Sequence, residues 1–188
     1  MGGLTSPLFK KYTKRNMACS NLTAGFVLDC NDQNGGIEKM FIANGPVEGI
    51  TASAGVLTAI TVDGSALVPA DFFVFELPRQ TASFTETVNV SQENGTVVYN
   101  QDLTVAFNKL EAEKRNQILL MAQATSMVVV FKTNAGKYFS VGVERGAFLS
   151  AGSAVSGTAY ADRAGYELTI SGIEAAPAYE VTSTIVEA

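Results

Sequence analysis

The 188-residue chain contains no histidine and no tryptophan, and only two cysteines, Cys19 and Cys30. Catalysis near neutral pH relies most often on histidine, so its absence excludes Ser-His-Asp triads, Cys-His pairs and histidine-bearing metal sites. Two cysteines are too few for a structural zinc site, which needs four nitrogen or sulfur ligands. We interpret them as reduced, partly buried thiols, with a local disulfide as the alternative. We expect no metal site and no cofactor.

Long apolar runs are also missing. No stretch approaches the roughly 18 apolar residues that cross a bilayer, and the N-terminus lacks the apolar segment of a signal peptide. Charged residues are few, at 16%, whereas glycine and short runs of valine, threonine, isoleucine and phenylalanine are frequent. This composition is typical of a β-rich globular protein with many turns. We expect no membrane association and no export.

Carboxylate pairs remain as candidates for catalytic groups, because a glycosidase needs only two of them. The candidate residues are Glu76, Glu86, Asp102 and Glu144. The sequence alone brings no two of them to a catalytic separation. Solvated charges on strand faces are the simpler interpretation, and we do not expect an enzyme.

Positive charge is concentrated near the N-terminus. Four basic residues and no acidic ones precede Met17, namely Lys10, Lys11, Lys14 and Arg15. The rest of the chain has 9 basic and 18 acidic residues. We interpret residues 1–16 as a flexible basic arm and residues 17–188 as one acidic domain; the alternative is an upstream leader before a natural start at Met17. An acidic domain argues against sequence-specific nucleic-acid binding but suits a surface along which DNA slides.

A pair of long, mostly polar strand patterns is the most informative feature. Residues 82–92 and 96–107 flank Asn94-Gly95, which predicts a β-hairpin with a type I′ turn. Each arm is about twice the usual strand length of roughly 5 to 6 residues. Alternate side chains fall on opposite faces: Ala82, Phe84, Val88 and Val90 on one, and Thr85, Thr87, Asn89 and Ser91 on the other. Such a ribbon, roughly 36 to 40 Å long, exceeds what one domain of this size covers, so we interpret it as an assembly element.

Turn chemistry and apolar patterns predict the remaining elements. We expect strands at residues 37–43, 56–62, 72–77, 127–132, 137–144 and 179–186, with 72–77 in the core. Asn108 as the cap and Glu111 three positions later predict a helix over about residues 109–124. Residues 147–157, rich in serine, alanine and glycine, are expected to form a loop. The predicted fold class is mainly β: one β-sandwich or barrel around a single core, with long hairpins and one flanking α-helix.

The order of elements after residue 70 resembles the tail tube (major tail) proteins of tailed bacteriophages and their relatives in contractile injection machines. The resemblance is carried by the hairpin at 84–107, the helix at 109–124, and the strand pair 127–132 and 137–144. The C-terminal stretches Ser-Gly-Thr-Ala at 156–159, the turn at 162–165 and Tyr-Glu-Leu-Thr-Ile at 166–170 are also similar to virion proteins of phages that infect Bacteroidetes-type hosts. Together they cover a little over half of the chain.

The resemblance implies a structural protein of the virion, assembled in the cytoplasm of the host bacterium. In that family, six subunits form a ring, each gives two hairpins to an inner barrel, and stacked rings form the tube through which the genome is ejected. Other tail or connector proteins would be partners, and DNA would pass as non-specific cargo. The residues that it places toward the lumen are Thr85, Thr87, Asn89, Asn100, Asp102 and Thr104. Contacts between subunits would involve residues 147–157 and the basic arm with Lys10, Lys11, Lys14 and Arg15.

Two other classes of protein fit the same composition. One is a different virion component, such as a connector ring, a head decoration or a fibre-base module, which would share the β-rich, assembly-prone character. The other is a monomeric carbohydrate-binding or adhesin β-sandwich, for which exposed aromatic platforms and a metal site would be expected. Ring stoichiometry separates the virion components from one another, and a stable monomer that binds glycans would favour the adhesin.

Overall fold

A computed structural model describes residues 24–28 and 34–187 of the chain. Residues 24–28 have no regular secondary structure. The β-rich unit begins after this segment and contains every described helix and strand. The basic arm predicted at residues 1–16, with Lys10, Lys11, Lys14 and Arg15, lies outside the described residues, as do Cys19 and Cys30.

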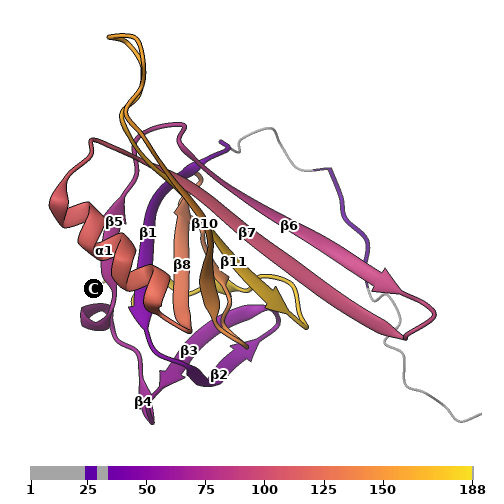
Figure 1. Cartoon of the computed structure of the whole chain (residues 1–188). Helices are drawn as coiled ribbons and strands as arrows, with labels where there is room; N and C mark the ends of the chain where they lie inside the picture. The colour runs from indigo at the N-terminus through magenta and orange to yellow at the C-terminus, as the bar shows by residue number, and fades with distance from the viewer. Residues whose placement is uncertain (1–23, 29–33, 188) are drawn as a thin grey trace, which may run out of the picture. The chain divides into compact units, whose positions relative to one another are not determined.

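Twelve strands and one α-helix make up most of this unit (Figure 1). The strands in chain order are β1 (Ile37–Asn44), β2 (Val47–Ser53), β3 (Val56–Val62), β4 (Ser65–Ala66), β5 (Phe73–Glu76), β6 (Ala82–Ser91), β7 (Thr96–Asn108), β8 (Met127–Thr133), β9 (Tyr138–Val141), β10 (Ala147–Val155), β11 (Gly165–Glu174) and β12 (Glu180–Val181). The helix α1 (Ala112–Gln123) lies between β7 and β8 in the chain, and two 3-10 turns, η1 (Pro69–Asp71) and η2 (Ser183–Ile185), complete the list.

All twelve strands belong to one hydrogen-bonded sheet, which divides into two parts, described here as two sheets, that are joined at one point. The first, here the body sheet, contains β5, β1, β8, β9, β12, β3, β2 and β4. The second, here the hairpin sheet, has the order β10-β11-β7-β6 and is antiparallel throughout. A single residue pair, Met127 with Ala147, connects β8 to β10 and so links the two sheets. The predicted fold class, a mainly β, sandwich-like fold with long hairpins and one helix, is confirmed.

The two central strands of the body sheet, β1 and β8, are buried on both faces. Successive side chains of a strand point to opposite sides, so an uninterrupted apolar run serves two apolar layers. Met127 and Val129 pack in a cluster shared with the hairpin sheet, whereas Val128 and Val130 pack in a second cluster with β3. The sequence predicted a single core; the buried residues of the described chain instead form two clusters on opposite sides of β1 and β8.

The first cluster is what holds the hairpin sheet against the body. Its buried members from the hairpin sheet are Leu103, Val105, Ala147, Leu168 and Ile170, and its members from the body sheet are Ile37, Met40, Ile42, Met127, Val129, Phe131 and Val141. Met121 is the buried residue that α1 contributes. The helix therefore lies on the apolar side of the hairpin sheet.

The helix begins later than the sequence predicted. Asn108 is the last residue of β7 instead of a helix cap, and Lys109 has a positive φ of 68°, which a right-handed helix excludes. The residue before the first helical turn is Glu111, whose side chain makes no capping hydrogen bond. The predicted helix is therefore present but three residues shorter at its start, because the sharp backbone turn at Lys109 intervenes.

Three other sequence predictions are wrong in detail. Residues 147–157 are not a loop: most of them form β10, which pairs with β11 over its whole length. The strand at 72–77 is only partly in the core: Phe72 is buried and Phe75 packs against the first cluster, but β5 is an edge strand paired only with β1, and its Phe73 and Val74 are exposed. The final strand at 179–186 is reduced to the short β12 followed by η2. The strand β2 was missed altogether, since its sequence VEGITAS has few apolar residues.

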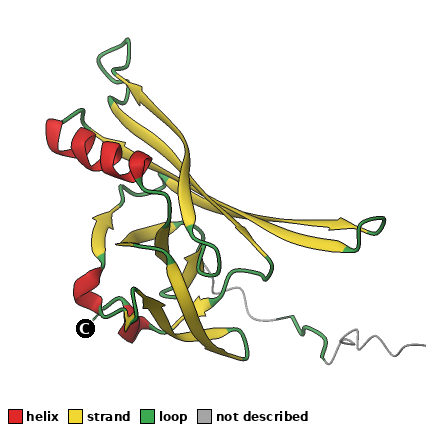
Figure 2. Ribbon diagram, turned by 60° about the horizontal axis from the view of Figure 1, so that its bottom comes forward, coloured by secondary structure: helices red, strands yellow, loops and turns green. Residues whose placement is uncertain are grey.

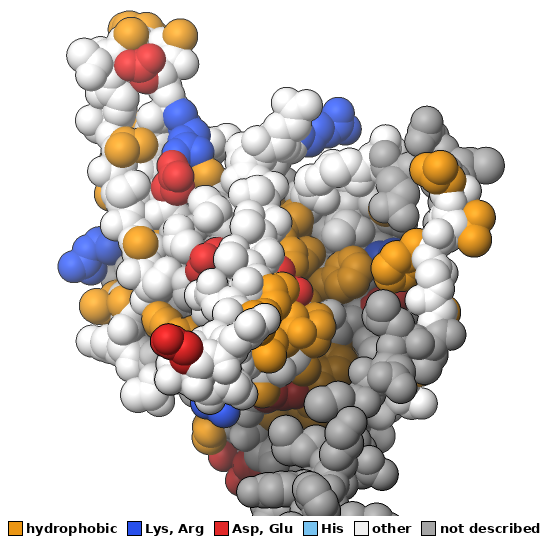
Figure 3. Space-filling view, turned by 90° about the vertical axis from the view of Figure 1, so that its right-hand side faces the viewer, with side chains coloured by type: hydrophobic (Ala, Val, Ile, Leu, Met, Phe, Trp, Pro, Cys, Tyr) orange, Lys and Arg blue, Asp and Glu red, His pale blue; other side chains and the backbone are white. Residues whose placement is uncertain are grey.

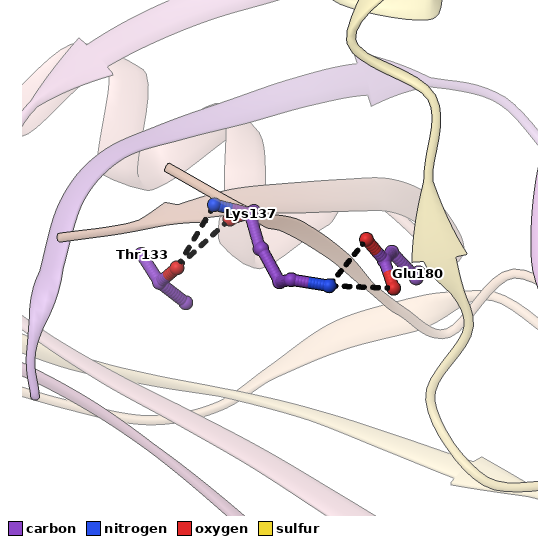
Figure 4. A network of polar contacts seen from close by, with 3 residues as sticks. All are labelled: Thr133, Lys137 and Glu180. Atoms are coloured by element: carbon purple, nitrogen blue, oxygen red, sulfur yellow. Dashed lines mark hydrogen bonds and ion pairs between the residues drawn. The ribbon is translucent and has the colours of Figure 1, made fainter. Parts of the chain in front are cut away.

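A small polar network fixes the short β12 beside β9 (Figure 4). The Lys137 ammonium lies 3.0 and 3.3 Å from the two carboxylate oxygens of Glu180. The backbone N–H of Lys137 donates to the Thr133 hydroxyl, which itself donates to the Lys137 carbonyl oxygen. This exposed ion pair links the β8–β9 turn to β12, whose backbone also pairs with β9 on one side and with β3 on the other.

Candidate assembly surface

The β6–β7 hairpin projects from the rest of the unit (Figures 1 and 2). In the half near the body, side chains on one face are buried or half-buried and those on the other are mostly exposed. From Val88 to the turn, residues on both faces of β6 are exposed or nearly so. The predicted long hairpin is therefore confirmed, and its outer half is not covered by any other described part of the β-rich unit.

The turn of this hairpin differs from the predicted one. A type I′ turn requires positive φ at both central residues, but of Asn94 and Gly95 only Gly95 has it, with φ of 62°. Ser91 pairs with Thr96, so four residues form the loop, and the Ser91 hydroxyl accepts the Asn94 N–H at 3.3 Å. Two successive positive φ values occur instead at Asp63-Gly64, between β3 and β4.

All six residues predicted to face a lumen lie on one face of the hairpin, here the polar face. The register pairs Thr85 with Asp102 and Thr87 with Asn100. Thr104 stands opposite Ser83, and Asn89 stands opposite Val98. The neighbouring strand β11 extends the same face with Thr169 and Ser171, which pair with Thr104 and Asp102. The opposite face, with Leu103 and Val105, packs on the core.

Hydroxyl groups connect the strands of the polar face. The Ser171 hydroxyl contacts both Asp102 and Ser150, with a distance of 2.8 Å to the Ser150 hydroxyl. Ser150 also donates to the Thr169 carbonyl oxygen at 3.0 Å. No lysine or arginine occurs in any of the four strands of the hairpin sheet. The polar face is therefore uncharged or acidic along its strands.

Both outer edges of the hairpin sheet are unpaired in the described part of the chain. The strand β6 ends the sheet on one side, and β10 is paired on its outer side only at Ala147. Soluble proteins usually protect such edges with lysine, proline, a bulge or a very short strand. The ten-residue β6 has none of these, and β10 has no charged residue or proline, although a bulge lies between Leu149 and Ala151. These edges are suited to pairing with another chain.

A buried polar network lies where the hairpin leaves the body. The side chain of Gln101, 2% exposed, accepts the Gly142 N–H at 3.2 Å and donates to Glu86 at 3.2 Å. Glu86 in turn accepts the N–H of Ala178 at 2.7 Å. Two loops that follow β9 and β11 are thereby fixed to the root of the hairpin. Among the candidate carboxylates, Glu86 and Asp102 lie on opposite faces of the hairpin, and Glu144 accepts a hydrogen bond from Tyr179.

Glu174, at the end of β11, is buried at 3% exposure in the same region. One carboxylate oxygen accepts the Arg145 N–H at 3.2 Å, whereas the other has no hydrogen-bond partner among the described residues. Burial raises the pKa of this carboxyl above its ordinary value of 4.5. The folded state therefore binds this proton more tightly than the unfolded state does, and stability declines as the pH rises through the folded pKa.

Replacing Glu174 by glutamine should raise stability at neutral and alkaline pH. The amide keeps an acceptor for Arg145 but carries no charge, so the variant should be more stable by about 1 to 3 kcal/mol where the wild-type carboxyl is ionised. The difference in stability between the variant and the wild type should vanish below pH 4.5, which is the ordinary pKa of this carboxyl group. Urea unfolding at several pH values measures this, with the exposed Glu93→Gln as the control. An equal gain at all pH values would contradict the prediction.

Sequence reasoning found the hairpin but not the second edge or the buried network. The small residues of β10 give no recognisable strand pattern in the sequence. The strand is identified only by its pairing with β11. Gln101 and Glu174 fall at positions where alternation predicts apolar side chains, which is the signal that could have marked them.

Comparisons with models of protein families, with curated proteins and with solved structures find no match for this chain. The described residues contain no helix that is both long and apolar enough to span a membrane. They also contain no group of three or more acidic, histidine or cysteine side chains arranged to hold a metal ion.

Proposed function

We propose that this protein is a structural component of a phage virion that assembles with copies of itself into rings, and that stacked rings form a tail tube through which DNA passes. The observation that supports it best is the hairpin sheet: four antiparallel strands with one polar face and two edges that are unpaired over most of their length. An exposed edge of this length is a site for pairing with another chain, and a closed ring of copies leaves no edge unpaired.

The direction of the strands favours this mode of assembly. Neighbours in the order β10-β11-β7-β6 are all antiparallel, so β10 and β6 run in opposite directions. If β10 of a second copy pairs with β6 of the first, the two strands are again antiparallel. Each added copy therefore presents a new β6 edge to the next copy, and the sheet extends without reversing any chain.

The polar face suits contact with passing DNA. Lysine and arginine contacts to phosphate supply most of the non-specific affinity of proteins for DNA. The four strands of the hairpin sheet have neither residue, and this face offers hydroxyl, amide and acidic groups. Turned toward a lumen, it would be hydrated and would not retain DNA. The basic arm with Lys10, Lys11, Lys14 and Arg15 would bind the acidic surface of a neighbouring copy.

Negative-stain electron microscopy of the purified protein over a range of concentrations tests the proposal. Discs or tubes of uniform diameter are expected, together with sedimentation faster than that of a monomer. Single rings that do not stack would favour a connector ring or another virion component. A stable monomer at all concentrations, particularly one with saturable glycan binding, would contradict the proposal in favour of an adhesin.

Lysine substitutions on the polar face should slow DNA passage without preventing assembly. In separate variants, Thr87→Lys and Asn100→Lys place a cation on the face proposed to line the lumen, where each would attract phosphate. The side chains point away from the core, so rings should form normally. Particles that carry either variant should release DNA several-fold more slowly, with Thr87→Gln as an uncharged control. An unchanged rate of release would count against a lumen location.

A further inference from the structure

The outer half of the β6–β7 hairpin has an apolar surface opposite its polar face. It consists of Val88, Val90 and Val97, here the valine stripe, which are 50%, 63% and 46% exposed. Val90 and Val97 are cross-strand partners, and Val88 pairs with Tyr99. Figure 3 views the molecule from the side toward which the hairpin points, and hydrophobic side chains are exposed at several places on that side. The stripe continues the face that, nearer the body, packs on the core.

The helix α1 also exposes large apolar side chains. Leu119 is 47% exposed and Leu120 is 59% exposed. The opposite side of the helix contributes Met121 to the cluster beneath the hairpin sheet, and its C-terminal end is close to the pair of Met127 and Ala147 where β10 begins. Thus α1 lies beside β10, on the same side of the hairpin sheet as the valine stripe.

These placements set the condition under which a neighbouring copy reaches the stripe. Through Gly172 and Gln101 the start of β10 is level with Glu86, so β10 of the neighbour must pair with β6 displaced toward the turn. If β10 of a second copy pairs with β6, as the proposed function requires, the apolar side of its hairpin sheet becomes continuous with that of the first copy. The helix beside its β10 then lies on the side where the valine stripe is exposed. We propose that the valine stripe of each copy packs against Leu119 and Leu120 of the adjacent copy in the same ring.

Two physical reasons favour the proposed contact: burial of apolar surface, and the choice of strand and register at the β6 edge. Removing apolar surface from water stabilises a complex. The β6 edge alone supplies backbone hydrogen bonds, which have little sequence preference, whereas an apolar contact beside it fixes which strand pairs there and in which register. The inference rests on the proposed function, but it commits to the lateral neighbour and not to a copy in the next ring.

Cysteine cross-linking between two variants tests the contact. In a chain with Cys19→Ser and Cys30→Ser, Val90→Cys and Leu120→Cys are made as separate proteins, mixed before assembly, and treated with a short bismaleimide. The mixture should give cross-linked dimers, and neither protein alone should. Thr87→Cys, on the polar face of the same strand, replaces Val90→Cys in the control mixture. The Val90 mixture should give on the order of tenfold more dimer than the control, because contact raises the effective concentration.

A protein with both Val90→Cys and Leu120→Cys should give a ladder of cross-linked species that ends at the copy number of one ring. Rings that form normally but give no more cross-linking than the Thr87 control would overturn this contact and leave the proposed function intact. Cross-links that join only copies of different rings would overturn it in the same way. If the unmodified chain forms no rings at all, both proposals fail.

Discussion

Replacement of residues 89–98 by a two-residue Asn-Gly turn is expected to abolish ring assembly while the body stays folded. The removed residues include no buried side chain, and Val88 and Tyr99 are a cross-strand pair that a two-residue turn can join. Because exposed residues contribute little to folding, the free energy of unfolding should change by less than about 1 kcal/mol. Assembly should be lost because the last three of the ten β6 residues and two of the three valines of the stripe, Val90 and Val97, are gone.

Sedimentation and electron microscopy measure the assembly of this variant, and urea unfolding measures its stability. A variant that keeps the full hairpin but carries Gln92→Ala at the exposed turn is the matched control and should assemble normally. Rings formed efficiently by the shortened chain would show that the outer half of the hairpin has no part in assembly. A large loss of stability would show that the outer hairpin is bound to the body after all.

A substitution in the core is expected to have the second large effect, a loss of stability. Phe131 on β8 is 2% exposed, and its ring centroid lies 4.8 Å from that of Phe84 on β6 and 6.0 Å from that of Phe139 on β9. Phe131→Ala should therefore destabilise the fold by about 3 to 5 kcal/mol, because it removes the side chain that packs the two sheets together. This loss is comparable with the total stability of many domains, so the variant should be largely unfolded near 37 °C.

Urea or thermal unfolding followed by circular dichroism measures this effect. Phe73→Ala, on the edge strand β5 where the ring is 60% exposed, is the matched control and should change the stability by less than about 1 kcal/mol. Equal effects of the two substitutions would show that the cluster between the sheets is not the principal core. An intermediate effect of Phe84→Ala would be consistent with a ring that is only half-buried.

Local patterns were sufficient to predict the elements whose stability is local or whose apolar pattern is strong. The hairpin of β6 and β7 follows from alternation around Asn94-Gly95, and β8 from its continuous apolar run. The alternation in the first arm also placed Thr85 and Thr87 together on the polar face. The fold class followed because most remaining segments are short, apolar and bounded by turn residues.

Elements that depend on distant partners could not be predicted. The small side chains of β10 have weak strand preference, and that segment becomes a strand through pairing with β11. The run at 72–77 is apolar enough for a core strand, yet the order of strands places β5 at an edge. The buried position of Glu174 depends on the loop with Glu144 and Arg145, which follows β9. In these segments the order and pairing of the strands, and not the residue composition, determine the structure.

The even number of strands in the hairpin sheet has a consequence for the geometry of any closed assembly. Because four alternating strands leave edges of opposite direction, five, six or seven copies would all close without a mismatched junction. Strand pairing by itself therefore sets no diameter. The curvature of each sheet and the angle at which side chains meet across the junction must select the ring size, so substitutions at the junction are the ones that would convert one symmetry into another.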